Sequence, residues 1–281
     1  CLSRGLGDVY KRQTTTRAAS ASASIAITAT ASGGLAYVNS NSLSFDGTGD
    51  ILTASGFVPY DEFGGDGTGD FTVSCWFKME STTAYDTIFS FGYELDDDPY
   101  LIVRKSGGAS PQLELQLDDG TGYVRERVTL PADDTWHHLA LTRQPGTTDG
   151  NIEVFLNGIS VIDVEDPICE IDFTLGGNES VLWIGGYRPA GPSAATTLWT
   201  GKLDDFAIWN EALSDEAIAE ISSIPTDLTL AEGDYTSGNV SALVGYWKMN
   251  EGTGTTVADS STNSNDASLE GDPTWSTDVP E

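Results

Sequence analysis

Hydrophobic and polar positions alternate over short runs through the middle of the chain. Gly, Asp and Pro separate these runs from about residue 40 to residue 209, and no helical periodicity comes between them. The run "QLELQL" (112–117) alternates strictly, which predicts a strand with one solvated face. The run "YLIVRK" (100–105) is apolar at its centre, which predicts a strand covered on both faces. The predicted strands are 71–79, 87–93, 100–105, 112–117, 136–143, 152–158, 181–187 and 204–210.

Strands at this spacing, joined by hairpin-length turns, predict an all-β antiparallel sandwich of two sheets. One short helix follows them in "LSDEAIAEISSIP". Ser214 is a suitable N-cap, acidic residues occupy the first turn, and Pro225 ends the helix. Because Ile218 and Ile221 fall at helical spacing, we expect this helix to close the sandwich with an apolar face.

The ends of the chain differ in composition from its middle. Residues 1–13 include three basic residues and no initiator Met, and they resemble translated sequencing-adapter sequence from environmental (metagenomic) assemblies. We therefore expect a non-native leader there. Residues 14–39 are an Ala/Ser/Thr-rich linker by composition. The sandwich is expected at 40–224, followed by a second linker at 225–242.

The net charge excludes several classes of partner. The chain has 43 Asp and Glu against 13 Lys and Arg, for a formal net charge of −30. Such a field repels phosphate backbones and anionic lipid surfaces, so we expect no nucleic-acid partner. No run approaches 18 consecutive apolar residues, so no membrane insertion is expected either.

The histidines and cysteines offer little catalytic chemistry. His137 and His138 are the only two histidines and are adjacent. Neighbouring residues of a strand point to opposite faces, so the two cannot hold one ion together, and we expect a structural role for both. With Cys1 set aside, Cys75 and Cys169 remain, either as buried thiols or as a single bridge.

A series of short motifs resembles the laminin G-like family of concanavalin A-like jelly rolls. In order, these are "LSFDGTGDIL", "FTVSCWFK", "WHHLALTR", "LWIGG" and "GKLDDFAIWNEALSDEAIAEI". The resemblance covers residues 40–224 and implies a jelly roll with one C-terminal closing helix. It also implies that "WHHLALT" is a packing strand of the sandwich rather than a reactive centre.

The resemblance implies a recognition or adhesion module in an extracellular, cell-surface or virion (phage structural) protein. We expect a glycan or a cell-surface glycoconjugate as the partner, with neighbouring domains of the same polypeptide as further partners. A ligand-free spacer in a tandem array is the alternative.

The segment 243–281 is similar to the lead-in that precedes "LSFDG" in such domains. It either starts a second repeat or folds back on the first domain.

A glycoside hydrolase is the third alternative, since the same superfold includes retaining glucanases. These enzymes need two carboxylates about 5–5.5 Å apart, which on this fold come from a Glu-x-Asp-x-Glu strand. Glu170 and Asp172 fit that pattern, but position 174 is Thr. We therefore predict no catalysis.

Acidic turns are candidate calcium ligands, because Ca²⁺ takes six to eight oxygen ligands from flexible Gly/Asp loops. "FDGTGD" places Asp46 and Asp50 in one turn, and Asp204 starts a later strand. Asp-Gly is also ordinary turn chemistry, so a purely structural role for all three stays open.

A saccharide site needs exposed aromatic residues with polar groups beside them. The longest irregular segment, 185–199, contains Tyr187, Arg188 and Trp199, and Tyr93 ends an earlier strand. Because binding residues concentrate on long loops of rigid scaffolds, these four are the predicted ligand-binding residues.

Overall fold

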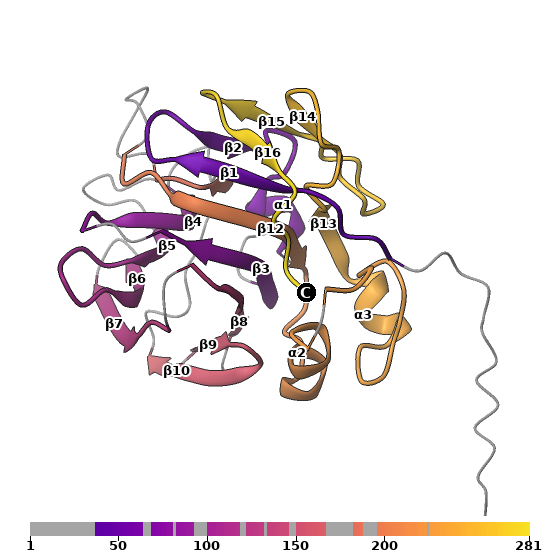
Figure 1. Cartoon of the computed structure of the whole chain (residues 1–281). Coiled ribbons are helices and arrows are strands. Elements are labelled where there is room, and N and C mark those ends of the chain that lie inside the picture. Colours follow the sequence, from indigo (N-terminus) through magenta and orange to yellow (C-terminus); the bar gives the residue numbers. More distant parts are fainter. Residues whose placement is uncertain are drawn as a thin grey trace, which may run out of the picture. The chain divides into compact units, whose positions relative to one another are not determined.

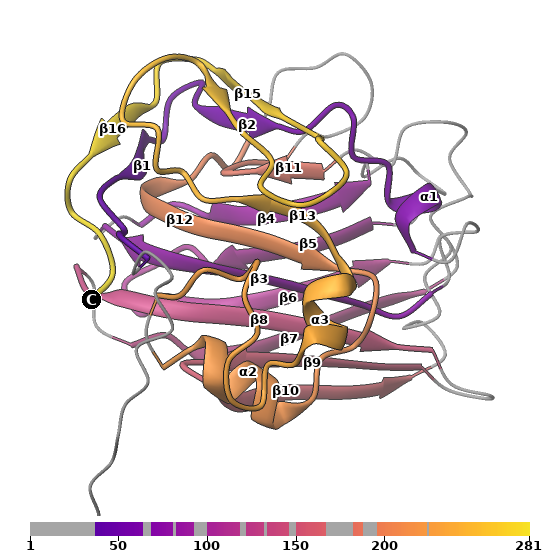
Figure 2. The same cartoon turned by 90° about the vertical axis from the view of Figure 1, so that its right-hand side faces the viewer.

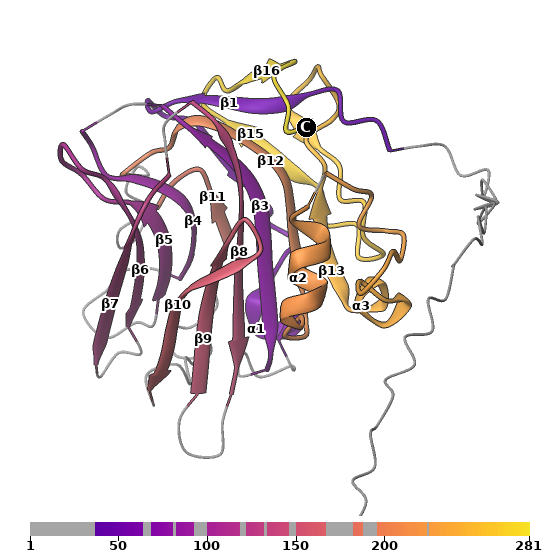
Figure 3. The same cartoon turned by 60° about the horizontal axis from the view of Figure 1, so that its bottom comes forward.

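The described part of the chain is a sandwich of two antiparallel sheets (Figure 1). The computed structural model describes residues 37–63, 69–80, 83–92, 100–118, 122–131, 134–145, 150–166, 182–187, 196–223 and 225–281. Figure 3 shows the two sheets edge on as separate layers, with the helices α2 and α3 outside one of them. The predicted all-β jelly-roll class is confirmed.

Sheet A runs in the order β10-β9-β8-β3-β12-β1-β16, and β13 pairs with the second half of β12. Its strands are β1 (Ser42–Asp46), β3 (Phe71–Met79), β8 (Trp136–Gln144), β9 (Gly150–Leu156), β10 (Ile159–Asp166), β12 (Thr200–Trp209), β13 (Leu243–Trp247) and β16 (Thr274–Ser276). The helices α2 and α3 lie over part of the outer face of this sheet, as Figure 2 shows.

Sheet B runs in the order β14-β15-β2-β11-β4-β5-β6-β7. Its strands are β2 (Ile51–Thr53), β4 (Asp86–Gly92), β5 (Tyr100–Lys105), β6 (Gln112–Asp118), β7 (Tyr123–Thr129), β11 (Leu182–Ile184), β14 (Thr256–Val257) and β15 (Ala267–Glu270). The predicted strand 112–117 corresponds to β6, and 100–105 to β5. The sequence reasoning missed β7, whose "YVRERVT" is a charged and largely exposed edge strand.

The core lies between the sheets and is built from the alternate residues of their strands. Leu113, Leu115 and Leu117 of β6 are fully buried there, as the period of two requires. Aromatic rings fill the centre in edge-on contacts; Phe89, for example, lies 5.7 Å from Phe206 of the opposite sheet. Cys75 is a free, fully buried thiol in this core, and burial raises the pKa of that thiol. Cys169 lies outside the described residues.

The closing helix is α2 (Asp215–Ile221), and Ser214 caps it by accepting a hydrogen bond from the Ala217 N–H at 3.2 Å. Its apolar stripe packs on the outer face of sheet A, where Ile218 and Trp209 share a second buried cluster. Two one-turn helices, α1 (Pro59–Glu62) and α3 (Ser237–Ser241), were not predicted because such short segments have almost no periodicity.

The segment 243–281 pairs with both sheets, which is the fold-back interpretation of this segment rather than the second repeat. Strand β13 pairs with β12 and β16 with β1 in sheet A, whereas β15 pairs with β2 in sheet B. Trp247 is fully buried in the core, 6.1 Å from the rings of both Phe57 and Phe206. The segment 225–242, which was expected to be a linker, is also part of the fold, because its residues Leu228 and Tyr235 are buried in the second cluster. The described sandwich therefore extends to residue 281.

Candidate functional site

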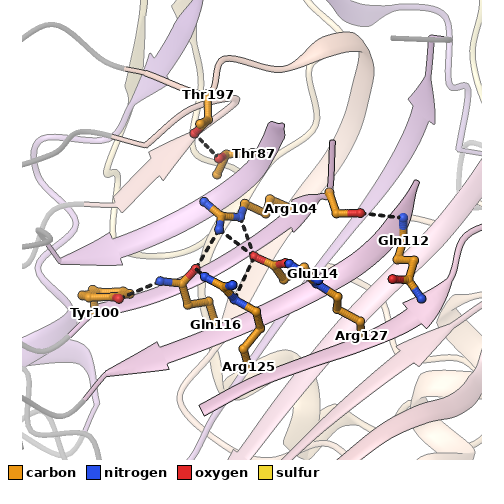
Figure 4. Close-up of polar contacts among 10 residues, drawn as sticks. Thr87, Tyr100, Arg104, Gln112, Glu114, Gln116, Arg125, Arg127 and Thr197 are labelled. Atoms are coloured by element: carbon orange, nitrogen blue, oxygen red, sulfur yellow. Dashed lines mark hydrogen bonds and ion pairs between the residues drawn. The ribbon is translucent and has the colours of Figure 1, made fainter. Parts of the chain in front are cut away.

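The outer face of sheet B presents a group of polar side chains from three neighbouring strands (Figure 4). Because side chains alternate along a strand, residues opposite in phase to the core leucines point outward. Cross-strand pairing sets Arg104 of β5 opposite Glu114 of β6, and Glu114 opposite Arg127 of β7. We call the set Arg104, Glu114, Gln116, Arg125 and Arg127 the arginine layer.

Glu114 is the centre of the arginine layer and has no exposed side-chain surface. Arg104 donates to its Oε1 from Nε at 2.8 Å and from Nη2 at 2.6 Å. Arg127 donates from Nε to Oε2, and Arg125 Nε lies 3.5 Å from Oε1. Three guanidinium groups therefore share one buried carboxylate, and the layer carries two positive charges in excess.

Gln116 links the arginine layer to a tyrosine. Its Oε1 accepts a hydrogen bond from Arg104 Nη2 at 2.8 Å, and its Nε2 donates to the Tyr100 hydroxyl at 2.6 Å. The carbonyl and amide ends of this side chain are thus fixed by their partners. The strand 112–117 was predicted to have a solvated face, and that expectation is wrong: Glu114 and Gln116 are buried because arginines from both neighbouring strands cover them.

Two exposed tyrosines contact guanidinium groups of the arginine layer. The ring of Tyr85 lies 4.7 Å from the guanidinium carbon of Arg104, and that of Tyr123 lies 5.2 Å from the guanidinium carbon of Arg125. Their exposed fractions are 40% and 46%, whereas most aromatic side chains in the described residues are buried. Exposed aromatic faces next to hydrogen-bond donors are the elements from which saccharide sites are made.

The four predicted ligand-binding residues do not form one site in the structure. Tyr187 is nearly buried on the outer face of sheet B, 6.5 Å from the ring of Tyr100. Trp199 is fully buried in the core against Phe77, so its prediction as a ligand contact is wrong. Exposure was expected because Trp199 ends the irregular segment 185–199, but its side chain lies in the core just before β12 begins. Tyr93 and Arg188 lie outside the described residues.

Of the three predicted calcium ligands, Asp46 and Asp50 lie together and Asp204 lies apart from them. Asp46 and Asp50 lie with Asp272, a residue of the fold-back segment, and one carboxylate oxygen from each falls within 4.8 Å of the others. Both oxygens of Asp50 already accept backbone N–H bonds, from Asp46 at 3.0 Å and from Asp272 at 2.9 Å. These bonds to the backbone agree with a purely structural role for Asp50 in the turn. Calcium binding there stays a prediction.

Asp204 lies elsewhere, four residues along β12 from Thr200, the partner of Asp46. It is fully buried beside Asp205 and accepts a hydrogen bond from Asn39 Nδ2 at 2.7 Å. Burial raises the pKa of both carboxyls, that of Asp205 to about 7. Tyr37 and Tyr246 donate to Asp205 Oδ1 at 2.6 and 2.7 Å. Asp204 therefore belongs, with Asp205, to a buried polar cluster and not to the turn of Asp46 and Asp50, which we call the rim turn.

The two histidines occupy different environments. His138 is buried on the outer face of sheet A, with its ring 5.2 Å from that of Trp76. Burial lowers the pKa of His138 to about 3, so this imidazole is neutral at pH 7. Thr135 and Asn157 lie within hydrogen-bond distance of the His137 ring nitrogens, at 2.7 and 3.1 Å. The buried position of His138 does not suit a general base.

The carboxylate on the outer face of sheet B, Glu114, is a possible catalytic group for a glycosidase. Both oxygens of Glu114 are held by arginines, so this carboxylate is not available to a substrate. Glu170 and Asp172, the candidates from the sequence, lie outside the described residues. Within the described part of the chain, no helix is long and apolar enough to cross a membrane.

Comparison with known proteins agrees with the all-β sandwich fold. A laminin G family model, described as "Concanavalin A-like lectin/glucanases superfamily", matches residues 46–219. This chain belongs to that family. Among curated proteins, neuronal pentraxin-2 of Mus musculus is 28% identical over 160 residues, which are 56% of this chain and 35% of the mouse protein. The match thus spans about a third of that relative's length.

Two solved structures share the fold of this laminin G-like chain. One is a candidate carbohydrate-binding protein from Bacteroides ovatus, with a TM-score of 0.60 and 20% identity over 87% of this chain and 62% of that one. The other is the CBM40 module of the Ruminococcus gnavus IT-sialidase, with a TM-score of 0.51 and 14% identity over 67% of this chain and 100% of the module. At these identities the likeness shows the fold alone.

Proposed function

We propose that this laminin G-like chain is a non-catalytic glycan-binding module that holds its ligand on the outer face of sheet B. The observation that carries the proposal is the pair of exposed tyrosines, Tyr85 and Tyr123, in contact with the arginine layer. Helices α2 and α3 lie outside part of sheet A (Figure 3). The outer face of sheet B instead offers the exposed rings of Tyr85 and Tyr123 and N–H donors of Arg125 and Arg127 to solvent.

The arrangement suits a saccharide for physical reasons. Sugar rings stack their C–H faces on aromatic rings and offer hydroxyl groups to fixed donors. Arg127 is held in place by its bonds to Glu114, so little of its side-chain entropy is lost on binding. The likeness to the Bacteroides structure supports this choice of ligand, since that protein is described as a candidate carbohydrate-binding protein, and the second structure is the CBM40 module of a sialidase. A cell-surface glycoconjugate is the partner we propose, with the module in an extracellular, cell-surface or virion protein.

A glycan array compares the wild-type chain with a Tyr85→Ala/Tyr123→Ala variant. We expect the wild type to bind a restricted set of glycans and the variant to lose this binding. Ile159→Ala is the matched control, because it removes an exposed apolar side chain (69% exposed) from sheet A. Binding that survives the double substitution would contradict the proposed face, and silence of the wild type on every glycan would favour the spacer alternative.

A further inference from the structure

The arginine layer is the place in the described residues where cations clearly outnumber carboxylates. Each described lysine has at least one carboxylate partner, as Lys105 has Asp86 at 2.8 Å and Lys248 has Asp227 at 2.9 Å. Three of the chain's 13 basic residues instead share Glu114. In a chain with a formal net charge of −30, this local excess of positive charge is a specific feature of one surface.

The three arginines are not equivalent. Arg104 is 12% exposed and is fixed by short bonds to Glu114 and Gln116. Arg125 is 40% exposed, and its contacts with Gln116 and Glu114 are long, at 3.4 and 3.5 Å. Arg127 is 35% exposed and bonds Glu114 through Nε and Nη2. Since a guanidinium has five N–H donors, Arg125 and Arg127 retain donors that face solvent.

These exposed donors match an anion. A guanidinium fork binds a planar carboxylate through two parallel hydrogen bonds, which are stronger than bonds between neutral groups. Glu114 lies buried beneath the arginines and does not cancel their charge. Tyr123 and Tyr85 stand beside Arg125 and Arg104, where they can contact the ring that bears the charged group.

We propose that the ligand of this face is an acidic saccharide whose carboxylate binds Arg125 and Arg127. This inference rests on the proposed glycan-binding function and narrows it to one chemical class. Arg104 is a positioning residue that orients Glu114 and Gln116, and Tyr85 and Tyr123 contact the sugar rings. A neutral saccharide would offer no negative charge to balance the positive charge that Arg125 and Arg127 carry in excess of Glu114.

Two pairs of probes test the charge with little other change. An oligogalacturonate is compared with its methyl ester, and 3′-sialyllactose with lactose, by calorimetric titration of the whole chain. We expect at least one acid to bind about tenfold or more tightly than its neutral partner, in keeping with one charge-assisted bidentate contact. Arg125→Gln should remove most of that preference. Because its contacts within the layer are long, this variant should keep the wild-type melting temperature.

Lys202→Gln is the control, since it removes one positive charge from sheet A and should leave the preference intact. Equal affinity for acid and neutral partner, or a preference that survives Arg125→Gln, would overturn the inference but leave glycan binding standing. Binding confined to a sulfated oligosaccharide would overturn the choice of a carboxylate. Failure to bind any saccharide on the array would overturn the proposed function itself.

Discussion

Replacing Trp247 with Ala tests whether residues 243–281 belong to the same folding unit as the sandwich. Trp247 has no exposed surface, and it contacts Phe57 edge-on and Phe206 at a tilt of 48°. Its Nε1 donates to the Asn265 carbonyl at 2.9 Å. Truncating a buried Trp to Ala costs about 3–5 kcal/mol, because the transfer free energy is lost and a cavity remains. The free energy of unfolding of a whole domain is about 5–15 kcal/mol, so the expected loss is a large part of the total.

Urea unfolding, followed by far-ultraviolet circular dichroism, measures this free energy for the whole chain. A single transition that moves to lower urea with an unchanged slope is the expected result for Trp247→Ala. Trp275→Ala is the matched control: it removes a partly exposed Trp of β16 and should cost less. A loss below about 1 kcal/mol for Trp247→Ala, or a second transition that alone responds, would show that 243–281 folds separately.

Three further predictions follow from the buried polar groups. Glu114→Gln should lower the free energy of unfolding by about 1–3 kcal/mol in urea titrations, since it leaves three arginines without their shared charge; an unchanged midpoint would contradict the layer. Because His138 stays neutral in the fold, its contribution to the free energy of unfolding is complete above pH 6.5 and is lost as the pH falls toward 3. The contribution of Asp205, whose folded pKa is raised, is complete below pH 3.8 and is lost as the pH rises toward 7. His138→Asn should therefore make stability fall more steeply with rising pH between about 4 and 6.5, and an unchanged profile would refute this assignment. Asp50→Ala should cost about 1–3 kcal/mol by leaving two backbone N–H groups without an acceptor; if the rim also binds Ca²⁺, a chelator should lower the melting temperature of the wild type and not of this variant.

Local patterns in the sequence were sufficient for much of the fold. The strand 71–79 and the Ser214 cap depend on alternation and on capping chemistry, both of which act within a few residues. The strand β7 escaped prediction because an edge strand with four polar or charged positions lacks a buried run. The role of 243–281 could not be derived from sequence, since pairing with β12 and β2 depends on contacts far apart along the chain.

The candidate site was harder to predict for the same reason. Glu114, Arg125 and Arg127 come from neighbouring strands whose register the sequence does not fix. One signal was present: "YVRERVT" places Arg125 and Arg127 two apart on one face, and "QLELQL" on the preceding strand has the single acidic residue Glu114. Trp199 was wrongly predicted to bind ligand, because a Trp in an irregular segment was expected to be exposed and is instead part of the core.

Mapping the bound saccharide by amide chemical shifts tests the central claim most directly. The isotope-labelled chain is titrated with the glycan that binds most tightly on the array. The account predicts that the largest shifts fall on β5, β6 and β7, and that the side-chain Nε–H signals of Arg125 and Arg127 move with them. Shifts confined to the rim turn at Asp46, or to α2 and α3 over sheet A, would contradict it.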